Sequence, residues 1–536
     1  MDTSNPAPDS DVYVTSSASA DAGLEAAASI SATADTCSLK STIELQSVTN
    51  EASHKLLTMI STTAPAAKSE VSRPAIDIIP VVDRSGSMHG KKMKLVKETL
   101  RLLIARSGLK STDRMGLVSF DHAVKEELPL ISMDAQGRAR ANSVVDAIEV
   151  GGTTNLSGGL MQAIDSLNQA AGAASTGRTR VVLLFTDGLA NEGIRDSATL
   201  VSAVKGAVGS TAMTLFTFGF GDDHAEDMLR SIAEPSSGLY YFISAVEDIP
   251  AAFADCLGGV MSVVAQNASL TLEPASNHQI GQILGSYNAS ESETAAGTTA
   301  MKVELGDLYA EDEKDLLVET LLPAISAPIE AAQAIVRAKL RYFSVASSRM
   351  EEVSTEVLVR RPSTTPSDQP VNVKLDEQRN RMRAAEAMEE AARLADAGDL
   401  EAGRALLQST KSIVSTSVSY ASPLSATLMR DCDLLTDQFA DVTSYRSLGR
   451  KTSTMSAHSH RRQRGNHTSD AYRAGSSAKA SMKTSWGLPE SSKAISKILP
   501  PPGLLVPKAA TSASSEVAQP ATDEPATPEA VLEPVA

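Results

Sequence analysis

Three oxygen-bearing side chains alternate in a short stretch of the sequence that could bind a metal ion. Asp83, Ser85 and Ser87 follow directly after an apolar run at residues 76–82. Such a run is typical of a buried parallel strand, and we expect a turn and then a helix starting near Gly90. The turn would bring the carboxylate and the two hydroxyls to one side. Because oxygen ligands suit hard divalent cations, we predict a metal site here.

Two later segments complete the predicted site. Thr154 precedes a predicted helix, and Asp187 ends a second apolar run at residues 181–185. We prefer Thr154 to the alternative, Thr153, because Thr154 lies closer to the helix start. Mg²⁺ typically keeps several waters and takes only one or two protein carboxylates. Two aspartates and three hydroxyls match that ligand set, so we predict Mg²⁺, with Mn²⁺ and Ca²⁺ as alternatives.

The charge of this ligand set predicts what else the ion would bind. Asp83 and Asp187 together cancel the charge of a divalent cation, and the hydroxyls are weak donors. We therefore expect the bound ion to accept one more anionic oxygen, supplied by an Asp or Glu of a partner protein. Arg84 stands between Asp83 and Ser85. Its guanidinium would either weaken metal binding or help to hold the partner's carboxylate, and we assign it as a partner-binding residue.

The order of these motifs resembles a known site. Asp-x-Ser-x-Ser at residues 83–87, then a threonine, then Thr-Asp-Gly at residues 186–188 resembles the metal-ion-dependent adhesion site of von Willebrand factor type A domains. The resemblance implies that Ser85 and Ser87 coordinate the metal directly. It also implies that Thr154 enters or leaves the coordination shell and that the carboxylates often act through water.

The elements around the site are those of a doubly wound α/β domain, which we place at residues 72–262. Apolar strands alternate there with amphipathic helices, the pattern of a parallel sheet covered on both faces. We predict strands at residues 76–82, 115–120, 181–185, 213–220 and 239–243. Ligands of such sheets bind at the carboxyl ends of the strands, where Asp83 and Asp187 would both lie.

The flanking segments predict a second and a third region. Residues 265–362 show strand alternation, and we expect a β-sandwich. Residues 37–70 contain two strand-like pieces that would complete this sandwich, so the α/β domain would be an insertion in it. Residues 373–442 have helical periodicity, which predicts a helical hairpin that turns at Gly398, with Asp399 as the N-cap of its second helix.

Both ends of the chain are predicted to be disordered. Residues 1–36 form an Ala/Ser/Thr/Asp-rich leader with few apolar side chains, and residues 444–536 form a tail with a basic part followed by a Pro-rich acidic part. The basic part contains His458, His460 and His467. We predict neither a metal site nor a nucleic-acid contact there, because no cysteine and no series of aromatic residues accompanies these histidines.

Charge and cysteine content exclude several classes of protein. A net charge of −16 disfavours nucleic-acid binding. Cys37, Cys256 and Cys432 lie too far apart for a disulfide framework or a zinc module. The sequence shows no secretory signal and no apolar run long enough to span a membrane. We predict an intracellular protein, cytoplasmic with a nuclear location as the alternative, and its oligomeric state stays open.

The resemblance extends beyond the α/β domain. Residues 304–319 and 373–388 look like the region that follows the A domain in plant-type A-domain proteins, many of which carry a RING finger and act as ubiquitin ligases. A RING finger needs about eight Cys and His ligands, whereas Cys37 is the only cysteine that precedes the α/β domain. We therefore do not carry ligase activity over to this chain.

The function that we predict is binding rather than catalysis. An aspartate with Mg²⁺ is similar to the phosphoryl-transfer loop of haloacid dehalogenases, but the second aspartate expected there is Ser85 in this chain. The sequence shows neither a phosphate-binding glycine loop nor an order of residues typical of a Ser-His-Asp triad. We predict an adaptor that holds an acidic residue of a partner through the metal. The alternative is an accessory subunit that recruits substrates to a ubiquitin ligase or an ATPase machine.

Overall fold

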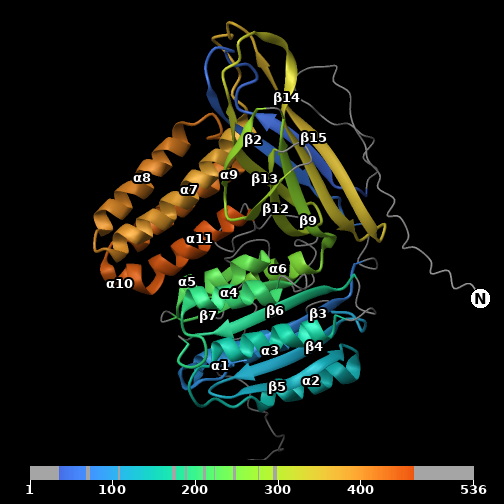
Figure 1. Ribbon diagram of the computed structural model, residues 1–536. Coiled ribbons are helices and arrows are strands. Elements are labelled where there is room, and N and C mark those ends of the chain that lie inside the picture. The colour runs from blue at the N-terminus through green and yellow to red at the C-terminus, as the bar shows by residue number, and fades with distance from the viewer. Residues whose placement is uncertain are drawn as a thin grey trace, which may run out of the picture.

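A computed structural model describes the chain from residue 35 to residue 463 and shows three packed regions (Figure 1). Gaps in this description fall at residues 68–72, 107–108, 172–176, 188–189, 209–212, 222–223, 245–248, 276 and 294–297. The predicted leader lies outside the described residues except for its last two, and so does the predicted tail beyond residue 463.

The α/β domain contains a six-stranded sheet in the order β5-β4-β3-β6-β7-β8. All neighbouring strands are parallel except β5, which pairs antiparallel with β4 at one edge. The strands are β3 (Ile76–Asp83), β4 (Arg114–Phe120), β5 (Val124–Ser132), β6 (Thr179–Thr186), β7 (Thr214–Phe220) and β8 (Tyr240–Ile243). Five of the six were predicted. The sixth, β5, was missed because the adjacent charged residues at 125–127 and then Pro129 interrupt its apolar alternation, a pattern that suits an edge strand.

Helices cover both faces of this sheet because successive strand residues point to opposite sides. Ile78 and Val82 of β3 pack into one core, and Ile79 and Val81 pack into the other. The first face is covered by α1 (Lys91–Arg106), α2 (Ala135–Ala147) and α6 (Ile249–Val260), and the second by α3 (Leu156–Gln169), α4 (Ser197–Val208) and α5 (Glu226–Ala233). Each fully buried Val, Leu or Ile side chain stabilises the fold by roughly 1.5–3 kcal/mol, so the two cores fix the sheet firmly.

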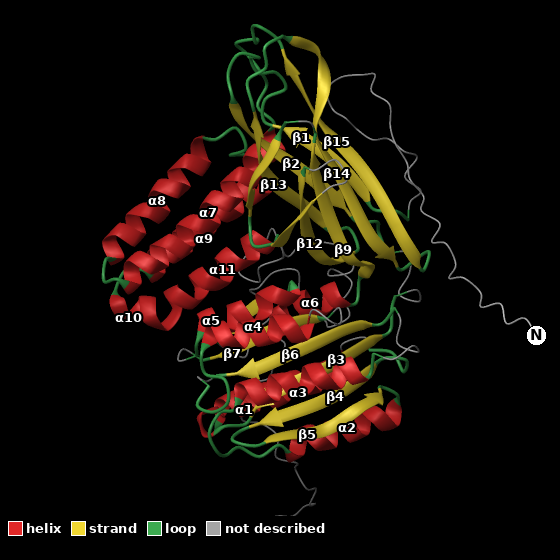
Figure 2. Cartoon of the chain, viewed as in Figure 1, coloured by secondary structure: helices red, strands yellow, loops and turns green. Residues whose placement is uncertain are grey.

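Two antiparallel sheets form the predicted sandwich around a shared core (Figure 2). The first has the order β1-β2-β13-β10 and the second the order β11-β12-β9-β14-β15. Their bounds are β1 (Ser38–Ile43), β2 (His54–Thr63), β9 (Val263–Pro274), β10 (Gln279–Leu284), β11 (Asn288–Glu293), β12 (Thr299–Tyr309), β13 (Glu313–Leu322), β14 (Ile329–Ser344) and β15 (Arg349–Arg361). Strand β2 pairs with β13 along its whole length. This pairing confirms that the α/β domain is inserted between strands of the sandwich.

The helical region begins with the predicted hairpin. Helices α7 (Val373–Asp396) and α8 (Leu400–Thr416) are joined through Gly398, whose φ of +94° is readily adopted only by glycine. The Asp399 side chain accepts a hydrogen bond from the backbone N–H of Ala402 at 2.9 Å, which confirms it as the N-cap. A third helix, α9 (Pro423–Gln438), packs against both.

The predicted start of the disordered tail at residue 444 was wrong. The chain continues as α10 (Val442–Ser444), a π-helical turn η6 (Tyr445–Gly449) and α11 (Arg450–Arg462), and residues 451–460 are all buried. Helix α11 lies between the helical region and the α/β domain (Figure 1). Its basic residues are typical of a solvated segment, but in the fold they meet acidic residues of other elements.

Ion pairs of α11 show how its charge is neutralised. Arg450 pairs with Glu226 and Asp227 of α5 and with Asp396 at the end of α7. His460 lies 3.0 Å from a carboxylate oxygen of Asp431 in α9. His467 lies outside the described residues. These partners come from distant parts of the sequence, which is why charge composition alone did not reveal them.

The described helices include none that is long and apolar enough to cross a lipid bilayer. The three cysteines are buried at separate places, in the sandwich core, on α6 and on α9.

Candidate metal centre

The predicted site lies at the carboxyl edge of the α/β sheet. Strands β3 and β6 are parallel neighbours, with Val82 opposite Phe185. Asp83 ends β3 and Asp187 directly follows β6, so both carboxylates emerge at the same edge. The chain leaves β3 towards β4 on one side and later returns to β6 on the other, and such a switch point is where open α/β sheets bind ligands. In Figure 2 the arrowheads of β4 and β6 point to this edge.

Asp83 shapes the loop that carries the two serines. Its Oδ1 accepts a hydrogen bond from the backbone N–H of Ser85 at 2.9 Å, and its Oδ2 accepts one from the Thr186 hydroxyl at 2.6 Å. The Asp83 side chain is completely buried. A buried carboxylate that accepts both a backbone and a side-chain hydrogen bond holds its loop in one conformation, and here it fixes Ser85 above the end of β3.

The two serine hydroxyls link the first segment to Asp187. The Ser85 and Ser87 Oγ atoms are 3.1 Å apart, and the Ser87 hydroxyl donates to Oδ1 of Asp187 at 2.9 Å. Residues a hundred positions apart in the chain are thus in direct contact. The side-chain oxygens of Ser85, Ser87 and Asp187 thus form a continuous series of contacts. Asp83 adjoins this series through its hydrogen bond with the Ser85 backbone.

Thr154 reaches the site through its loop. The backbone N–H of Gly86 donates to the carbonyl of Gly152 at 3.1 Å, so the loop before α3 lies against the serine loop. Thr154 is buried, but its hydroxyl forms no hydrogen bond with Asp83, Ser85, Ser87 or Asp187, all of which belong to the described residues. Thr153 is exposed, and its hydroxyl donates instead to the carboxylate of Glu192.

Arg84 turns towards another carboxylate. Its guanidinium donates to Oδ1 of Asp121 at 3.0 Å and lies 2.7 Å from Oδ2, while its Nε donates to the Ser119 hydroxyl at 3.2 Å. Asp121 is buried, so this pair is well shielded from water. The role of Arg84 in binding a partner stays a prediction, and any carboxylate that binds it must compete with Asp121.

Sequence reasoning missed one charged residue at the site. The ammonium group of Lys92, in the first turn of α1, contacts Oδ2 of Asp187. A lysine at the start of a helix opposes the helix dipole, which favours negative groups there. Several lysines at this helix start were the signal for a nearby carboxylate, but the sequence does not distinguish Lys92 from the exposed Lys91.

Electrostatics at the site favour the arrival of a cation. Burial, together with the nearby charge of Asp187, raises the pKa of Asp83 despite the hydrogen bonds that it accepts from Thr186 and Ser85. The Lys92 ammonium contacts Asp187, so these three side chains, when all are ionised, sum to a charge of −1. Counted over these three side chains, one negative charge is in excess.

The atoms that could act as metal ligands indicate which ion would fit the site. Within the described part of the chain, no three His, Cys, Asp or Glu side chains gather as a metal cluster. The residues that do gather offer serine hydroxyls and two carboxylates, with a threonine nearby. Hydroxyl and carboxylate oxygens suit Mg²⁺, Mn²⁺ and Ca²⁺ rather than zinc, which prefers nitrogen and sulfur.

Comparisons with known proteins agree with this fold. Residues 77–255 match the family model of the von Willebrand factor type A domain. Two relatives from Arabidopsis thaliana are the E3 ubiquitin-protein ligase WAV3, 30% identical over 262 residues, and the E3 ubiquitin-protein ligase WAVH1, 26% identical over 356 residues. The aligned parts cover 47% and 65% of this chain, but only 32% and 47% of those relatives.

A solved structure covers much of the chain. The structure of a von Willebrand factor type A protein from Catenulispora acidiphila superposes with a TM-score of 0.61 over 77% of this chain and 96% of that one. The sequence identity of 17% means that this likeness establishes the fold alone.

Proposed function

We propose that this chain, whose residues 77–255 form a von Willebrand factor type A domain, is a protein-binding adaptor that holds an acidic side chain of its partner through a divalent cation. The observation that carries this proposal is the series of oxygens from Ser85 through Ser87 to Asp187 at the switch point of the sheet. A set of weak hydroxyl donors with few carboxylates would leave a bound cation able to attract an anionic ligand.

Each residue of the site has a proposed role. Ser85 and Ser87 would contact the cation directly, because the Ser87 hydroxyl already contacts Asp187 and the Ser85 hydroxyl lies beside that of Ser87. Asp83 and Asp187 would supply negative charge, and Thr154 would join from the loop before α3. The bound cation would supply a strong electrostatic attraction for a carboxylate. Mg²⁺ is the proposed ion, with Mn²⁺ and Ca²⁺ as the alternatives.

Calorimetry of the full chain tests the cation. Titration with Mg²⁺ is expected to give saturable heat with the wild type and none with Asp83→Ala. The matched control is Asp165→Ala, which removes an exposed aspartate from α3 and is expected to bind Mg²⁺ as the wild type does. Repeating the titration with Mn²⁺ and Ca²⁺ ranks the ions. Equal heats from the wild type and Asp83→Ala would contradict the proposed metal site.

Affinity capture tests the partner. Proteins retained from a cell extract by the wild type in Mg²⁺ are compared with those retained in EDTA and with those retained by Asp83→Ala. Partners that depend on the cation are expected to be lost in both comparisons and kept by Asp165→Ala. A set of partners that is unchanged by EDTA and by Asp83→Ala would contradict metal-dependent recognition.

A second candidate function is the recruitment of substrates to a ubiquitin ligase. The observation that favours it is the similarity to relatives that are named as ubiquitin ligases, over 47% and 65% of this chain. The same metal edge would then bind a substrate while other regions contact the ligase. This function would be favoured over a stand-alone adaptor if a ligase co-purified with the chain even in EDTA while other partners were lost in EDTA.

A further inference from the structure

The missed residue Lys92 lies where it must affect any cation at the site. Its ammonium group contacts Oδ2 of Asp187, and the Ser87 hydroxyl contacts Oδ1 of the same carboxylate. The Asp187 side chain is fully buried, and that of Lys92 is 23% exposed. Both oxygens of one predicted metal-binding carboxylate therefore already have donors from the chain, and one of these donors is positively charged.

A charge count shows the consequence. Among the described side chains, Asp83 and Asp187 contribute −2 and Lys92 contributes +1, while Arg84 and Asp121 form a neutral pair beside them. A divalent cation adds +2 to this sum. With a neutral side chain at position 92, the loaded site would carry one positive charge fewer.

We propose that Lys92 adds a positive charge to the cation-loaded site, so that the cation binds more weakly on its own than together with a carboxylate from the partner. This inference rests on the proposed function and adds a mechanism that couples the two binding events. Repulsion between the ammonium group and the cation weakens the binding of the metal. The same excess of positive charge strengthens the attraction for an anionic ligand.

Thermodynamic linkage makes the coupling reciprocal. If a carboxylate raises the affinity for the cation by some factor, the cation raises the affinity for the carboxylate by the same factor. Lys92 therefore selects against occupation by the metal alone. It also discriminates against uncharged ligands, because a neutral oxygen does not compensate the excess charge.

The test is calorimetric and uses the full chain. Lys92→Met removes the charge but keeps most of the aliphatic stem, and it is expected to bind Mg²⁺ about tenfold more tightly than the wild type. Lys92→Arg keeps the charge and is expected to stay within about twofold of the wild type. The control is Lys91→Met, whose exposed neighbouring charge is screened by solvent, and it too is expected to change the affinity by no more than about twofold.

A second titration measures the coupling itself. Mg²⁺ is titrated in sodium acetate and in sodium chloride at matched ionic strength, with acetate as the carboxylate probe. Acetate is expected to raise the Mg²⁺ affinity of the wild type and of Lys92→Arg more than that of Lys92→Met. Thermal unfolding of each variant in EDTA identifies any that fails to fold, and Lys92→Gln then replaces Lys92→Met.

The outcomes separate the two proposals. If the wild type binds Mg²⁺ and Lys92→Met binds it with the same affinity, Lys92 only stabilises the fold, and the inference is overturned while the metal site stands. If neither protein binds Mg²⁺, both proposals fall. Tighter binding by Lys92→Met with a smaller acetate effect supports the inference.

Discussion

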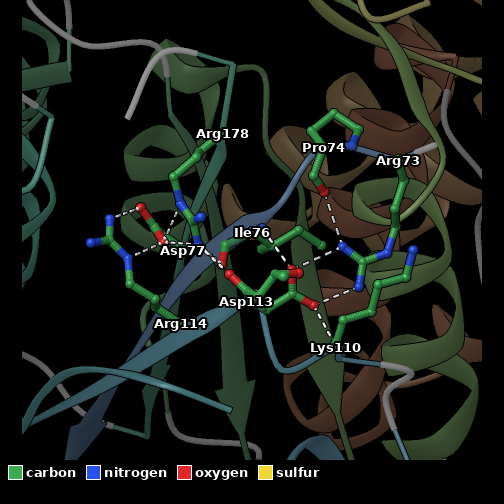
Figure 3. Close-up of polar contacts among 9 residues, drawn as sticks. Arg73, Pro74, Ile76, Asp77, Lys110, Asp113, Arg114 and Arg178 are labelled. Atoms are coloured by element: carbon green, nitrogen blue, oxygen red, sulfur yellow. Dashed lines mark hydrogen bonds and ion pairs between the residues drawn. The ribbon is translucent and has the colours of Figure 1, made fainter. Parts of the chain in front are cut away.

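Two pairs of buried aspartates, one at each end of the same sheet, are held by different kinds of donor. At the end where the parallel strands begin, Asp77 and Asp113 are surrounded by arginines (Figure 3). At the end where the strands finish, Asp187 contacts Lys92 and the Ser87 hydroxyl, and Asp83 accepts hydrogen bonds from Ser85 and Thr186. Arginine charge thus balances the first pair of carboxylates, whereas mainly neutral donors hold the second pair.

The arginine-rich end shows what a satisfied carboxylate looks like. Asp77 accepts hydrogen bonds from Arg114 at 2.8 and 2.6 Å and from Arg178 at 2.8 Å. Asp113 accepts hydrogen bonds from Arg73 at 3.0 and 2.5 Å and also from two backbone N–H groups. Figure 3 shows both carboxylates enclosed by these donors. Bidentate pairs of this kind are strong and geometrically specific.

The directions of the pKa shifts express the same difference. Burial alone would raise the pKa of Asp77, but the hydrogen bonds and charges of Arg114 and Arg178 outweigh it, so that the pKa is lowered. The pKa of Asp113 is lowered in the same way by Arg73 and backbone donors. Burial and the charge of Asp187 raise the pKa of Asp83. Of these three aspartates, Asp83 is the one whose environment opposes ionisation.

The largest expected effect comes from a matched pair of substitutions. Asp77→Asn leaves Arg114 and Arg178 without a compensating charge and is expected to lower the free energy of unfolding by about 3 kcal/mol. Asp83→Asn relieves repulsion with Asp187 and is expected to change it by less than about 1 kcal/mol in EDTA. Urea unfolding of both variants measures the difference. A loss at Asp83 as large as that at Asp77 would show that both ends are structural.

A pair of glycines gives an intermediate effect. Gly152, with φ of +74°, lies beside the metal site, and a Cβ there would be 2.5 Å from Nδ1 of His122. Gly177, with φ of +84°, lies near the opposite end, and a Cβ there would meet nothing. Alanine at either position is expected to lower stability by roughly 1–2 kcal/mol through backbone strain. Only Gly152→Ala is expected to weaken Mg²⁺ binding in calorimetry, and equal Mg²⁺ affinities would contradict this difference.

The smallest expected effect is on the dependence of stability on pH. A lowered pKa means that Asp77 and Asp113 contribute stability at neutral pH and lose it as pH falls below about 4. The raised pKa of Asp83 has the opposite sign, because the folded protein binds that proton more tightly than the unfolded chain does. In EDTA, the stability of the wild type relative to Asp83→Asn should therefore increase by up to about 1 kcal/mol as pH falls from neutral towards 4.

Urea unfolding at a series of pH values measures this effect. Asp77→Asn serves as the comparison, because its expected pH dependence has the opposite sign. The stability of the wild type relative to Asp77→Asn should fall only below about pH 4. If the stability differences for Asp77→Asn and Asp83→Asn changed with pH in the same way, the environments of Asp77 and Asp83 would not differ as described.

Local patterns predicted the parts of the fold that depend on local chemistry. Asp83, Ser85, Ser87 and Asp187 were predicted to lie together because strand ends and turns have recognisable residues, and the fold does bring these four together. The insertion of the α/β domain was predicted because strands at residues 37–70 needed partners, and β2 pairs with β13 as expected. Apolar periodicity likewise predicted most of the central sheet.

Contacts between distant segments were harder to predict. Helix α11 was taken for a tail because its charges are neutralised only in three dimensions, by residues such as Glu226 and Asp396. Lys92 was overlooked because its partner, Asp187, lies far along the chain. The orientation of Arg84 towards Asp121 also depends on a neighbouring strand rather than on the motif around it.

The insertion of the α/β domain also determines how the protein would transmit mechanical load. The chain enters this domain after β2, which ends at Thr63, and returns at β9, which starts at Val263. Because β2 and β9 belong to the two sheets of one sandwich, two chain segments rather than one attach the α/β domain to that sandwich. A pull on the carboxyl edge of the α/β sheet would therefore load both connections at once.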